Sequence, residues 1–212
     1  PSMDPLGPRL AVAGVFSHAG GLLVNRVARW DGTAWAAMGD GFNNNVGALA
    51  VYDDGSGPAL IAGGSFTHSG TTPINHIARW TGTTWVQLGS GLDGPVDVLT
   101  AHDEGAGADL YAFGGFVHSG GVWTGMVARW EGTSWSSVGN PLGLFAEDAL
   151  SFDDGTGTKL YATGLFSAAQ GSVGYGLARW DGTSWTAFTS GLADPMEGSD
   201  YVGYALEAWE DG

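Results

Sequence analysis

Apolar and polar positions alternate along this chain in short stretches, and glycine-rich turns separate one stretch from the next. Within residues 46–88, the apolar stretches cover residues 46–52, 59–66, 76–80 and 84–88. Short stretches with β-branched and aromatic side chains, bounded by Gly, Asp and Ser, predict β-strands. No stretch has the period of an α-helix, and the many glycines disfavour long helices. The pattern therefore predicts an all-β protein with four strands in this segment.

The four-strand pattern is one copy of a repeat. The sequence Ile-Ala-Arg-Trp-Thr-Gly-Thr-Thr-Trp at residues 77–85 has close copies at residues 27–35, 127–135 and 177–185, with fifty residues between equivalent positions. A fixed period of this size is typical of proteins built from stacked repeats. Four antiparallel strands in each repeat predict the blade of a β-propeller. An open solenoid is the alternative, but hairpin turns such as Asp31-Gly32 favour antiparallel strands.

The two ends of the chain each supply part of a repeat. Residues 9–38 hold the second, third and fourth strands of a blade, and residues 202–209 are similar to the missing first strand. We therefore expect a C-terminal strand to complete the N-terminal blade. The expected fold is one β-propeller domain, residues 1–212, of four-stranded antiparallel blades. The four blades are expected at residues 202–212 with 9–38, at 46–88, at 96–138 and at 146–188.

Two arrangements of the four blades stay open at this point. Four blades are the lower limit of the propeller architecture, so the chain can close a ring by itself. Alternatively, the four blades are an arc of a larger ring, completed by a second chain or by a longer parent chain. Self-association into a larger ring is therefore one expected mode of binding.

The composition supports a packed protein and excludes several classes of partner. Aromatic residues make up 12% of the chain, with ten Trp among them, and they supply a core in spite of the 38 glycines. The formal net charge is −15, with only seven Lys and Arg, so the surface repels phosphate backbones and anionic lipids. No apolar run approaches the length of a membrane span. We expect no nucleic acid partner and no membrane insertion, and the acidic surface suits a secreted protein.

Three motifs carry a resemblance to a known family. They are Asp-Asp-Gly-Ser-Gly-Pro at residues 53–58, Ala-Gly-Gly-Ser-Phe-Thr at residues 62–67 and Ile-Ala-Arg-Trp at residues 77–80. Together they resemble the kelch-like, galactose-oxidase-like repeats of large bacterial secreted proteins, and the resemblance covers essentially the whole chain. It implies a β-propeller and an extracellular or cell-surface location in a bacterium. The fourth copy departs from the pattern, since residues 163–166 have lost one Gly and Ala168 stands where the other copies carry His.

The resemblance does not extend to the chemistry of galactose oxidase. The chain has no Cys, so the tyrosine–cysteine cofactor of such a copper enzyme cannot form. Disulfides, thiolate metal sites and a cysteine nucleophile are excluded for the same reason. The sequence also has no serine-hydrolase elbow and no zinc-protease motif. We therefore expect no catalytic residues, and the chain is expected not to be an enzyme.

The most regular side chains of the repeat are two Trp and one Arg in each copy. Because each blade buries the same face against its neighbour, we expect the Trp pairs to pack between blades. A buried Arg needs an anion or several carbonyls, so we expect each Arg to pair at a blade junction either with a carboxylate, of which the acidic turns are the nearest repeated source, or with backbone carbonyls. These structural positions are Arg29, Arg79, Arg129, Arg179, Trp30, Trp35, Trp80, Trp85, Trp130, Trp135, Trp180 and Trp185.

The acidic turns are also the candidate calcium sites. Asp53, Asp54, Asp153 and Asp154 bring together carboxylate oxygens, which hard cations prefer. Each turn is too short to surround an ion by itself, and Asp-Gly turns are equally well explained by hairpin formation. Calcium therefore stays an optional cofactor, and no other cofactor is expected.

Departures from the repeat are the candidate ligand-binding positions, because blade architecture does not require them and they fall in expected surface loops. The preferred function is a non-catalytic binding or interaction module of a secreted or cell-surface protein, with a protein or glycan ligand. One alternative is a carbohydrate-binding or carbohydrate-active propeller, with calcium as an option, and another is a structural unit for homo-oligomeric assembly. The candidate residues are Trp123, Tyr175, Asp194, Glu197 and Asp200, and residues 42–45 also depart from the repeat.

Overall fold

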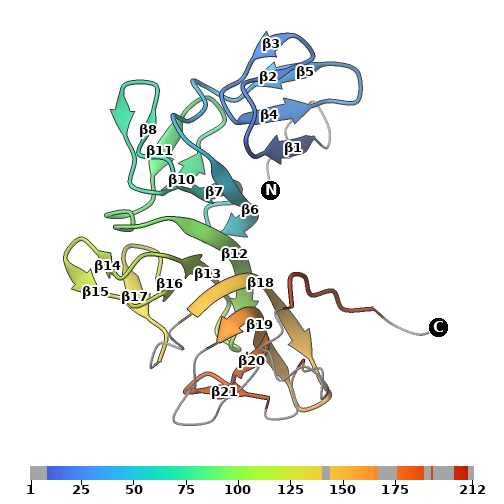
Figure 1. Ribbon diagram of the computed structural model, residues 1–212, viewed down its shortest axis with the longest axis vertical. Helices are drawn as coiled ribbons and strands as arrows, with labels where there is room; N and C mark the ends of the chain where they lie inside the picture. Colours follow the sequence, from blue (N-terminus) through green and yellow to red (C-terminus); the bar gives the residue numbers. More distant parts are fainter. Residues whose placement is uncertain (1–8, 140–143, 167–175, 189–191, 193–202, 210–212) are drawn as a thin grey trace, which may run out of the picture.

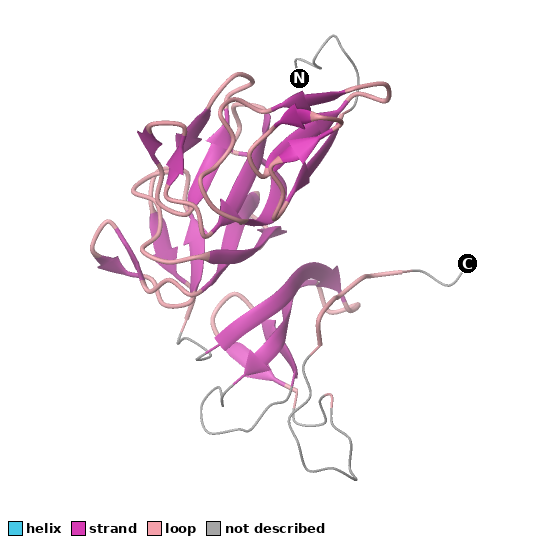
Figure 2. Cartoon of the chain, turned by 45° about the horizontal axis from the view of Figure 1, so that its top comes forward, coloured by secondary structure: helices cyan, strands magenta, loops and turns pink. Residues whose placement is uncertain are grey.

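The computed structural model is an all-β structure in which four antiparallel sheets follow one another along the chain (Figures 1 and 2). The structure describes residues 9–139, 144–166, 176–188, 192 and 203–209. Within these residues the chain forms strands and turns but no helix (Figure 2). The all-β fold built of antiparallel sheets, which the sequence predicts, is confirmed. We number the four sheets 1 to 4 in chain order.

Sheet 1 has three strands and sheets 2, 3 and 4 have four strands each. Sheet 1 consists of β1 (Leu10–Ala13), β4 (Val27–Trp30) and β5 (Trp35–Ala37). Sheet 2 consists of β6 (Val46–Asp53), β7 (Pro58–Gly64), β10 (Ile77–Trp80) and β11 (Trp85–Gln87). Sheet 3 consists of β12 (Val96–Asp103), β13 (Ala108–Gly114), β16 (Val127–Trp130) and β17 (Trp135–Ser137). Sheet 4 consists of β18 (Leu144–Asp153), β19 (Thr158–Phe166), β20 (Gly176–Trp180) and β21 (Trp185–Ala187).

Three short hairpins interrupt the connection between the second and third strands of a repeat. They join β2 (His18–Ala19) to β3 (Leu22–Leu23), β8 (His68–Ser69) to β9 (Thr72–Pro73), and β14 (His118–Ser119) to β15 (Val122–Trp123).

The three four-stranded sheets share one register, so the sequence repeat is also a structural repeat. In each sheet the end of the first strand pairs with the start of the second strand in the same way. The equivalent pairs are Tyr52 with Ala59, His102 with Asp109, and Phe152 with Lys159. Each first strand carries an irregularity at the equivalent place, between residues 46 and 48, 96 and 98, and 146 and 148. Positions fifty residues apart can therefore be compared directly from one sheet to the next.

Neighbouring sheets pack face to face around shared apolar cores. Tyr52 and Ile61 of sheet 2 belong to the same buried cluster as Leu99 and Leu110 of sheet 3. The second Trp of the second, third and fourth repeats lies at such a junction and donates its indole N–H to a backbone carbonyl that follows the last strand of the preceding sheet. These hydrogen bonds join Trp85 to Met38 at 2.9 Å, Trp135 to Leu88 at 3.3 Å, and Trp185 to Val138 at 3.2 Å.

Glycine permits the close approach of the first Trp of each repeat to the preceding sheet. Gly89 has a φ of +62°, and a Cβ at this position would lie 2.5 Å from Trp130 Cζ3. Gly139 lies in the same way beneath the ring of Trp180, where a Cβ would lie 2.6 Å from Cζ3. A side chain at either position would strain the backbone and push the indole away. The Gly that ends each repeat therefore sets how closely the next sheet packs.

The completion of the N-terminal blade by the C-terminal segment is not formed in this structure. Sheet 1 contains β1, β4 and β5, and the described part of the chain provides no fourth strand. Residues 203–209 form no strand, and Leu206 N–H donates to Asp148 Oδ2 of sheet 4 at 2.7 Å. The physical reason is distance, because sheets 1 and 4 lie at opposite ends of the long axis (Figure 1). The four sheets therefore form an open stack.

Candidate interaction site at the ends of the sheet stack

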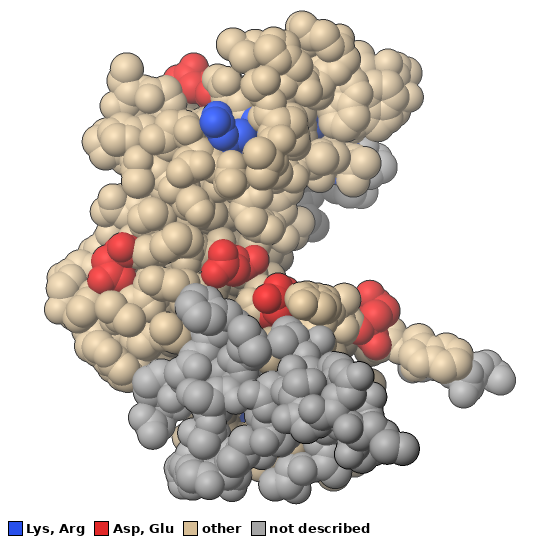
Figure 3. All heavy atoms as spheres, in the orientation of Figure 1, with Lys and Arg blue, Asp and Glu red and all other residues tan. Residues whose placement is uncertain are grey.

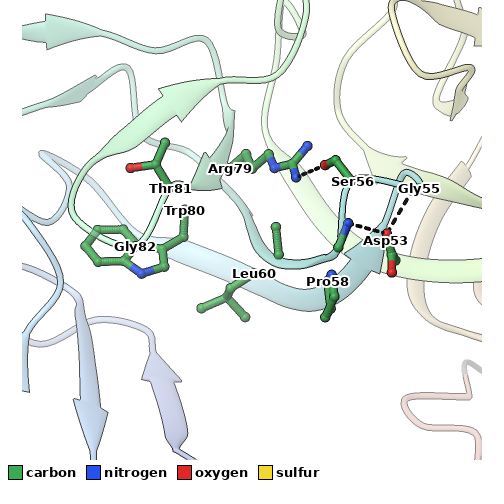
Figure 4. A pocket seen from close by; sticks show the side chains of 11 residues that line it. Asp53, Gly55, Ser56, Pro58, Leu60, Arg79, Trp80, Thr81 and Gly82 are labelled. Carbon is green, nitrogen blue, oxygen red and sulfur yellow. Dashed lines mark hydrogen bonds between the residues drawn. The ribbon is translucent and has the colours of Figure 1, made fainter. Parts of the chain in front are cut away.

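The repeated Arg pairs with a carboxylate of the acidic turn in its own sheet. Arg79 forms an ion pair with Asp54 and donates to Ser56 Oγ at 2.9 Å (Figure 4). Hydrogen bonds from Ser56 and from Arg79 lower the pKa of Asp54 to about 2. The ion pair therefore connects the strand β10 to the β6–β7 turn within sheet 2, whereas the sequence suggested a junction between sheets. The equivalent pairs join Arg129 to Glu104 at 3.4 Å and Arg179 to Asp154 at 3.1 Å.

Glu104 has a further role that joins sheets 3 and 4. Its Oε1 accepts hydrogen bonds from Trp180 Nε1 at 2.7 Å and from the Tyr111 hydroxyl at 2.8 Å. The equivalent residue of sheet 2 is Asp54, which is shorter by one methylene group. The Nε1 of Trp130, the equivalent of Trp180, is buried and has no hydrogen-bond partner among the described residues. The length of the acidic side chain therefore decides whether this junction is bridged.

An open cavity of about 1030 Å³ lies beside the acidic turn of sheet 2. Figure 4 shows Arg79 directed toward Ser56, while Trp80 lies on the other side of the cavity near Leu60. The polar groups of the turn and of Arg79 already bond to one another. The cavity therefore offers a ligand the Trp80 ring and apolar neighbours such as Leu60, together with polar atoms of the turn.

The carboxylates proposed as calcium ligands accept hydrogen bonds from their own turns. Asp53 Oδ1 accepts from the N–H groups of Gly55 and Gly57, both at 2.9 Å. Asp153 does the same for the equivalent glycines, and Asp154 accepts from Thr156, Tyr161 and Arg179. In the described ranges, no group of three or more His, Cys, Asp and Glu side chains is arranged to hold a metal ion. These contacts explain the acidic turns without an ion, and calcium binding stays a prediction.

Of the predicted ligand-binding residues, the structure describes only Trp123. Trp123 is exposed on β15, at a hairpin beside sheet 3. The other candidates, Tyr175, Asp194, Glu197 and Asp200, lie outside the described residues.

Residues 42–45, which depart from the repeat in sequence, have a structural role. Phe42 is buried and stacks on Phe66 with ring centroids 4.0 Å apart. Asn43 Oδ1 accepts from the N–H groups of Thr67 and His68 at 2.9 and 3.0 Å. Asp93 makes the equivalent contacts to the next hairpin. The available signal was the fifty-residue spacing, because it aligns Phe42 with the apolar Leu92 and Asn43 with Asp93.

The outer face of sheet 1 lacks the neighbour that covers the equivalent face of the other sheets. Leu10 is 59% exposed, whereas the equivalent Leu110 and Leu160 are fully buried at 0% and Leu60 is partly buried. Trp35 is partly exposed, whereas its three equivalents are buried. In sheets 2 to 4 this face packs on the preceding sheet. Sheet 1 therefore has an apolar face and a strand edge, that of β1, both without a partner in the described chain.

A second gap lies between sheets 1 and 2, next to the free edge of β1. A cavity of about 340 Å³ separates Ala11 and Arg29 of sheet 1 from Val51 and Leu60 of sheet 2. Val51 is 66% exposed there, although its equivalents Ala101 and Ser151 are partly covered by the preceding first strand. The cavity therefore lies beside the edge of β1 that no described strand occupies.

The other end of the stack is also incomplete. Phe152 of sheet 4 is 41% exposed, whereas the equivalent Tyr52 and His102 are buried against the next sheet. Burial lowers the pKa of His102, and its Nδ1 lies 2.9 Å from Ser151 Oγ across the junction. Residues 203–209 project from sheet 4 (Figures 1 and 3) and leave Tyr204 and Trp209 exposed.

Comparisons with known proteins add no assignment. No protein family, no curated protein and no solved structure matches this chain. A search of the described residues for a helix long and apolar enough to cross a membrane found none.

Proposed function

We propose that the chain is a non-catalytic β-propeller module that joins other four-blade units through its two ends, the three-stranded sheet 1 and the uncovered face of sheet 4 with residues 203–209. Sheets 1 to 4 are its four blades, and the ring closes only with a further unit. The observation that carries this proposal is the contrast at equivalent positions, since Leu110 and Leu160 are fully buried and Leu10 is exposed. The kelch-like motifs support a place in a secreted or cell-surface bacterial protein.

Two physical arguments support assembly through the ends. A β-strand edge with free N–H and C=O groups pairs readily with another strand unless the sequence protects it. The strand β1 (Leu-Ala-Val-Ala) carries no charged residue and no Pro that would block such pairing. The exposed Leu10 and Trp35 beside this edge add apolar area whose burial favours association.

The repeated polar side chains support a structural role for the blades. Arg79, Arg129 and Arg179 make the same kind of ion pair in three sheets. The indole N–H groups of Trp85, Trp135 and Trp185 likewise repeat one hydrogen bond. Side chains that make the same contact in successive repeats are explained by packing within and between blades. The surfaces that differ from this pattern are the two ends of the stack.

The cavity beside Trp80 favours glycan binding as a second candidate function. An aromatic face next to polar groups suits a sugar ring, and the cavity is open to solvent. Screening the chain on a glycan array tests this candidate. Signals that disappear in the Trp80→Ala variant would support it, and signals that persist would refute a site at this cavity.

Native mass tests the principal proposal. Light scattering on a sizing column should give a mass above the 21.8 kDa of one chain at micromolar concentrations. The Leu10→Glu variant should remain at the mass of a single chain, because a carboxylate on the uncovered face opposes its burial. Leu23→Glu, at an exposed position on a hairpin, is the matched control and should leave the mass unchanged. A wild-type mass of one chain at all concentrations would contradict the proposal.

A further inference from the structure

We infer that the C-terminal segment, residues 203–209, is the missing first strand of sheet 1 in a second copy of this chain. The inference rests on the proposed function and specifies both the partner and the contact. The segment lies beyond sheet 4 in one copy and would pair with the free edge of β1 in the other. Two reciprocal exchanges close a ring with twice the four sheets of one chain, which is near the upper end of the propeller range.

The position of Gly203 is the first observation. Aligning residues 210–212 with the acidic turn 53–55 makes Gly203 equivalent to Val96, the first residue of β12. In the interior of the stack Val96 lies against Gly63 of the preceding sheet. Gly203 lies in the same way against Thr163, the equivalent of Gly63 in sheet 4. The C-terminal segment therefore begins where the first strand of a fifth sheet would begin.

The hydrogen bond between Leu206 N–H and Asp148 Oδ2, at 2.7 Å, is the second observation. It fixes the middle of the segment against β18, and β18 is the strand that a following first strand would contact. In the interior, β12 contacts both β6 and β18 in this way. The segment is thus placed for its role, and among the described residues no second, third and fourth strands lie beside it. Sheet 1 consists of those three strands and lacks the first.

The exposed aromatic side chain of Trp209 is the third observation. Trp209 is 76% exposed and is equivalent to Tyr52 and His102, which are buried. His102 contacts Ser151 of the following sheet at 2.9 Å. Trp209 is equivalent to His102, and Val51 is equivalent to Ser151. The contact equivalent to that of His102 with Ser151 therefore joins Trp209 to Val51 of the second copy, beside the cavity between sheets 1 and 2. Trp209 would therefore cover Val51 and fill this cavity.

The charges on the two surfaces agree with this pairing. The chain has only seven Lys and Arg, and Arg9 and Arg29 both line the cavity beside the edge of β1. The C-terminal segment carries Glu207. An acidic strand entering beside two cationic side chains gains electrostatic attraction, which partly offsets the repulsion between two chains of net charge −15.

The register of the exchanged strand follows from the complete sheets. Val98 pairs with Phe113, and the equivalent pair is Ala205 with Ala13. Both alanines can be replaced by cysteine with little change in volume, and the native chain has no cysteine. Mixing an Ala13→Cys chain with an Ala205→Cys chain, in the presence of a short bis-maleimide, should give a covalent dimer. Ala13→Cys mixed with Ala208→Cys is the matched control, since that pair is three residues out of register, or about 10 Å apart.

A chain that carries both Ala13→Cys and Ala205→Cys distinguishes strand pairing between two copies from pairing of the C-terminal segment with sheet 1 of the same chain. The inference predicts dimers, whereas a cross-link within single chains would overturn it in favour of a four-blade ring. A ladder of larger species would overturn the closed two-chain ring. Failure to cross-link while light scattering still gives a multiple of one chain would overturn strand exchange and leave the proposed function standing. A mass of one chain would contradict both.

Two further variants guard against misfolding and adventitious cross-linking. Ala11→Cys with Glu207→Cys is a second pair in the same register and should also give the dimer. Trp209→Ala should slow cross-linking of the first pair by at least about tenfold, since a central Trp commonly dominates an interface. An unchanged rate in Trp209→Ala would overturn the contact with Val51. Circular dichroism of each variant should match that of the wild-type chain.

Discussion

The substitution Glu104→Asp tests whether side-chain length bridges sheets 3 and 4. In the structure, Glu104 Oε1 accepts from Trp180 Nε1 at 2.7 Å and from the Tyr111 hydroxyl at 2.8 Å. Aspartate keeps the charge but is one methylene group shorter. Sheet 2 already contains that arrangement, since Asp54 leaves the indole N–H of Trp130 without a partner among the described residues. We therefore expect Glu104→Asp to lose the hydrogen bond from Trp180, while Tyr111 keeps a carboxylate acceptor, as Tyr161 does with Asp154 at 2.9 Å in sheet 4.

The expected loss follows from the burial of the donor that loses its acceptor, although both donors to Glu104 are buried. Trp180 is 6% exposed and Tyr111 is 0% exposed. A buried donor left without an acceptor costs about 1–3 kcal/mol, and Glu104→Asp leaves one such donor, the indole N–H of Trp180. For a chain of this size, the melting temperature should fall by about 2–4 °C for each kcal/mol. The reciprocal change Asp54→Glu offers Trp130 an acceptor and should stabilise the fold by about 1 kcal/mol.

Urea unfolding followed by tryptophan fluorescence measures both variants. A double-mutant cycle with Trp180→Phe removes the donor, so Glu104→Asp should cost less in that background. The reasoning would be refuted if Glu104→Asp stayed within about 0.5 kcal/mol of the wild type. Equal costs of Glu104→Asp with and without Trp180 would also refute the hydrogen bond as the cause.

Three other predictions concern the repeated side chains. Arg79→Met should lower the free energy of unfolding by about 1 kcal/mol or less, because its ion pair is partly exposed. Arg129→Met loses contacts to several carboxylates and should lower it by about 1–2 kcal/mol, as measured by urea unfolding. Trp85→Ala should lower the free energy of unfolding by about 3–5 kcal/mol. At concentrations too low for the chains to assemble, Trp35→Ala should cost less than half of that, because no preceding sheet covers Trp35. Similar values for both variants would contradict the role of Trp in packing between sheets. The pKa of Asp54 is lowered to about 2 in the folded state, so its contribution is complete above the unfolded value of about 4 and is lost as the pH falls toward 2. The melting temperature of Asp54→Asn should therefore decline less than that of the wild type over this pH range, and parallel declines would count against the assignment.

The repeat made the individual sheets predictable from sequence. The four main strands of sheets 2, 3 and 4 and their acidic hairpin turns follow from apolar stretches, Gly and Asp at fixed spacing, whereas the three short hairpins were not predicted and the strand expected at residues 202–209 is not formed in the described residues 203–209. An acidic turn was also one of the expected partners of each Arg, and Arg79 and Asp54 are such a pair. These features depend on residues close in sequence or on one repeat unit, which is why a local pattern reveals them.

The arrangement of the sheets could not be predicted in the same way. Whether residues 203–209 reach sheet 1 depends on the angle between successive sheets, which contacts such as Gly89 beneath Trp130 determine. The bridging role of Glu104 depends on one methylene group. Asp54 and Glu104 carry the same charge at equivalent positions, so the pattern of charges in the sequence does not distinguish them. The sequence indicates a departure from the repeat at residues 42–45, because Asn43 and Asp93 differ in type. In the structure the two side chains make the same contacts.

Hydrogen exchange at the free edge of sheet 1 tests the central claim most directly. The peptide covering β1 (Leu10–Ala13) has one unpaired edge in a single chain and gains a partner strand on assembly. Amide exchange of this peptide should slow as the protein concentration rises, while exchange in the interior strand β13 (Ala108–Gly114) should stay constant. Equal exchange of β1 at low and high concentration would contradict the account, because it would mean that no strand joins this edge.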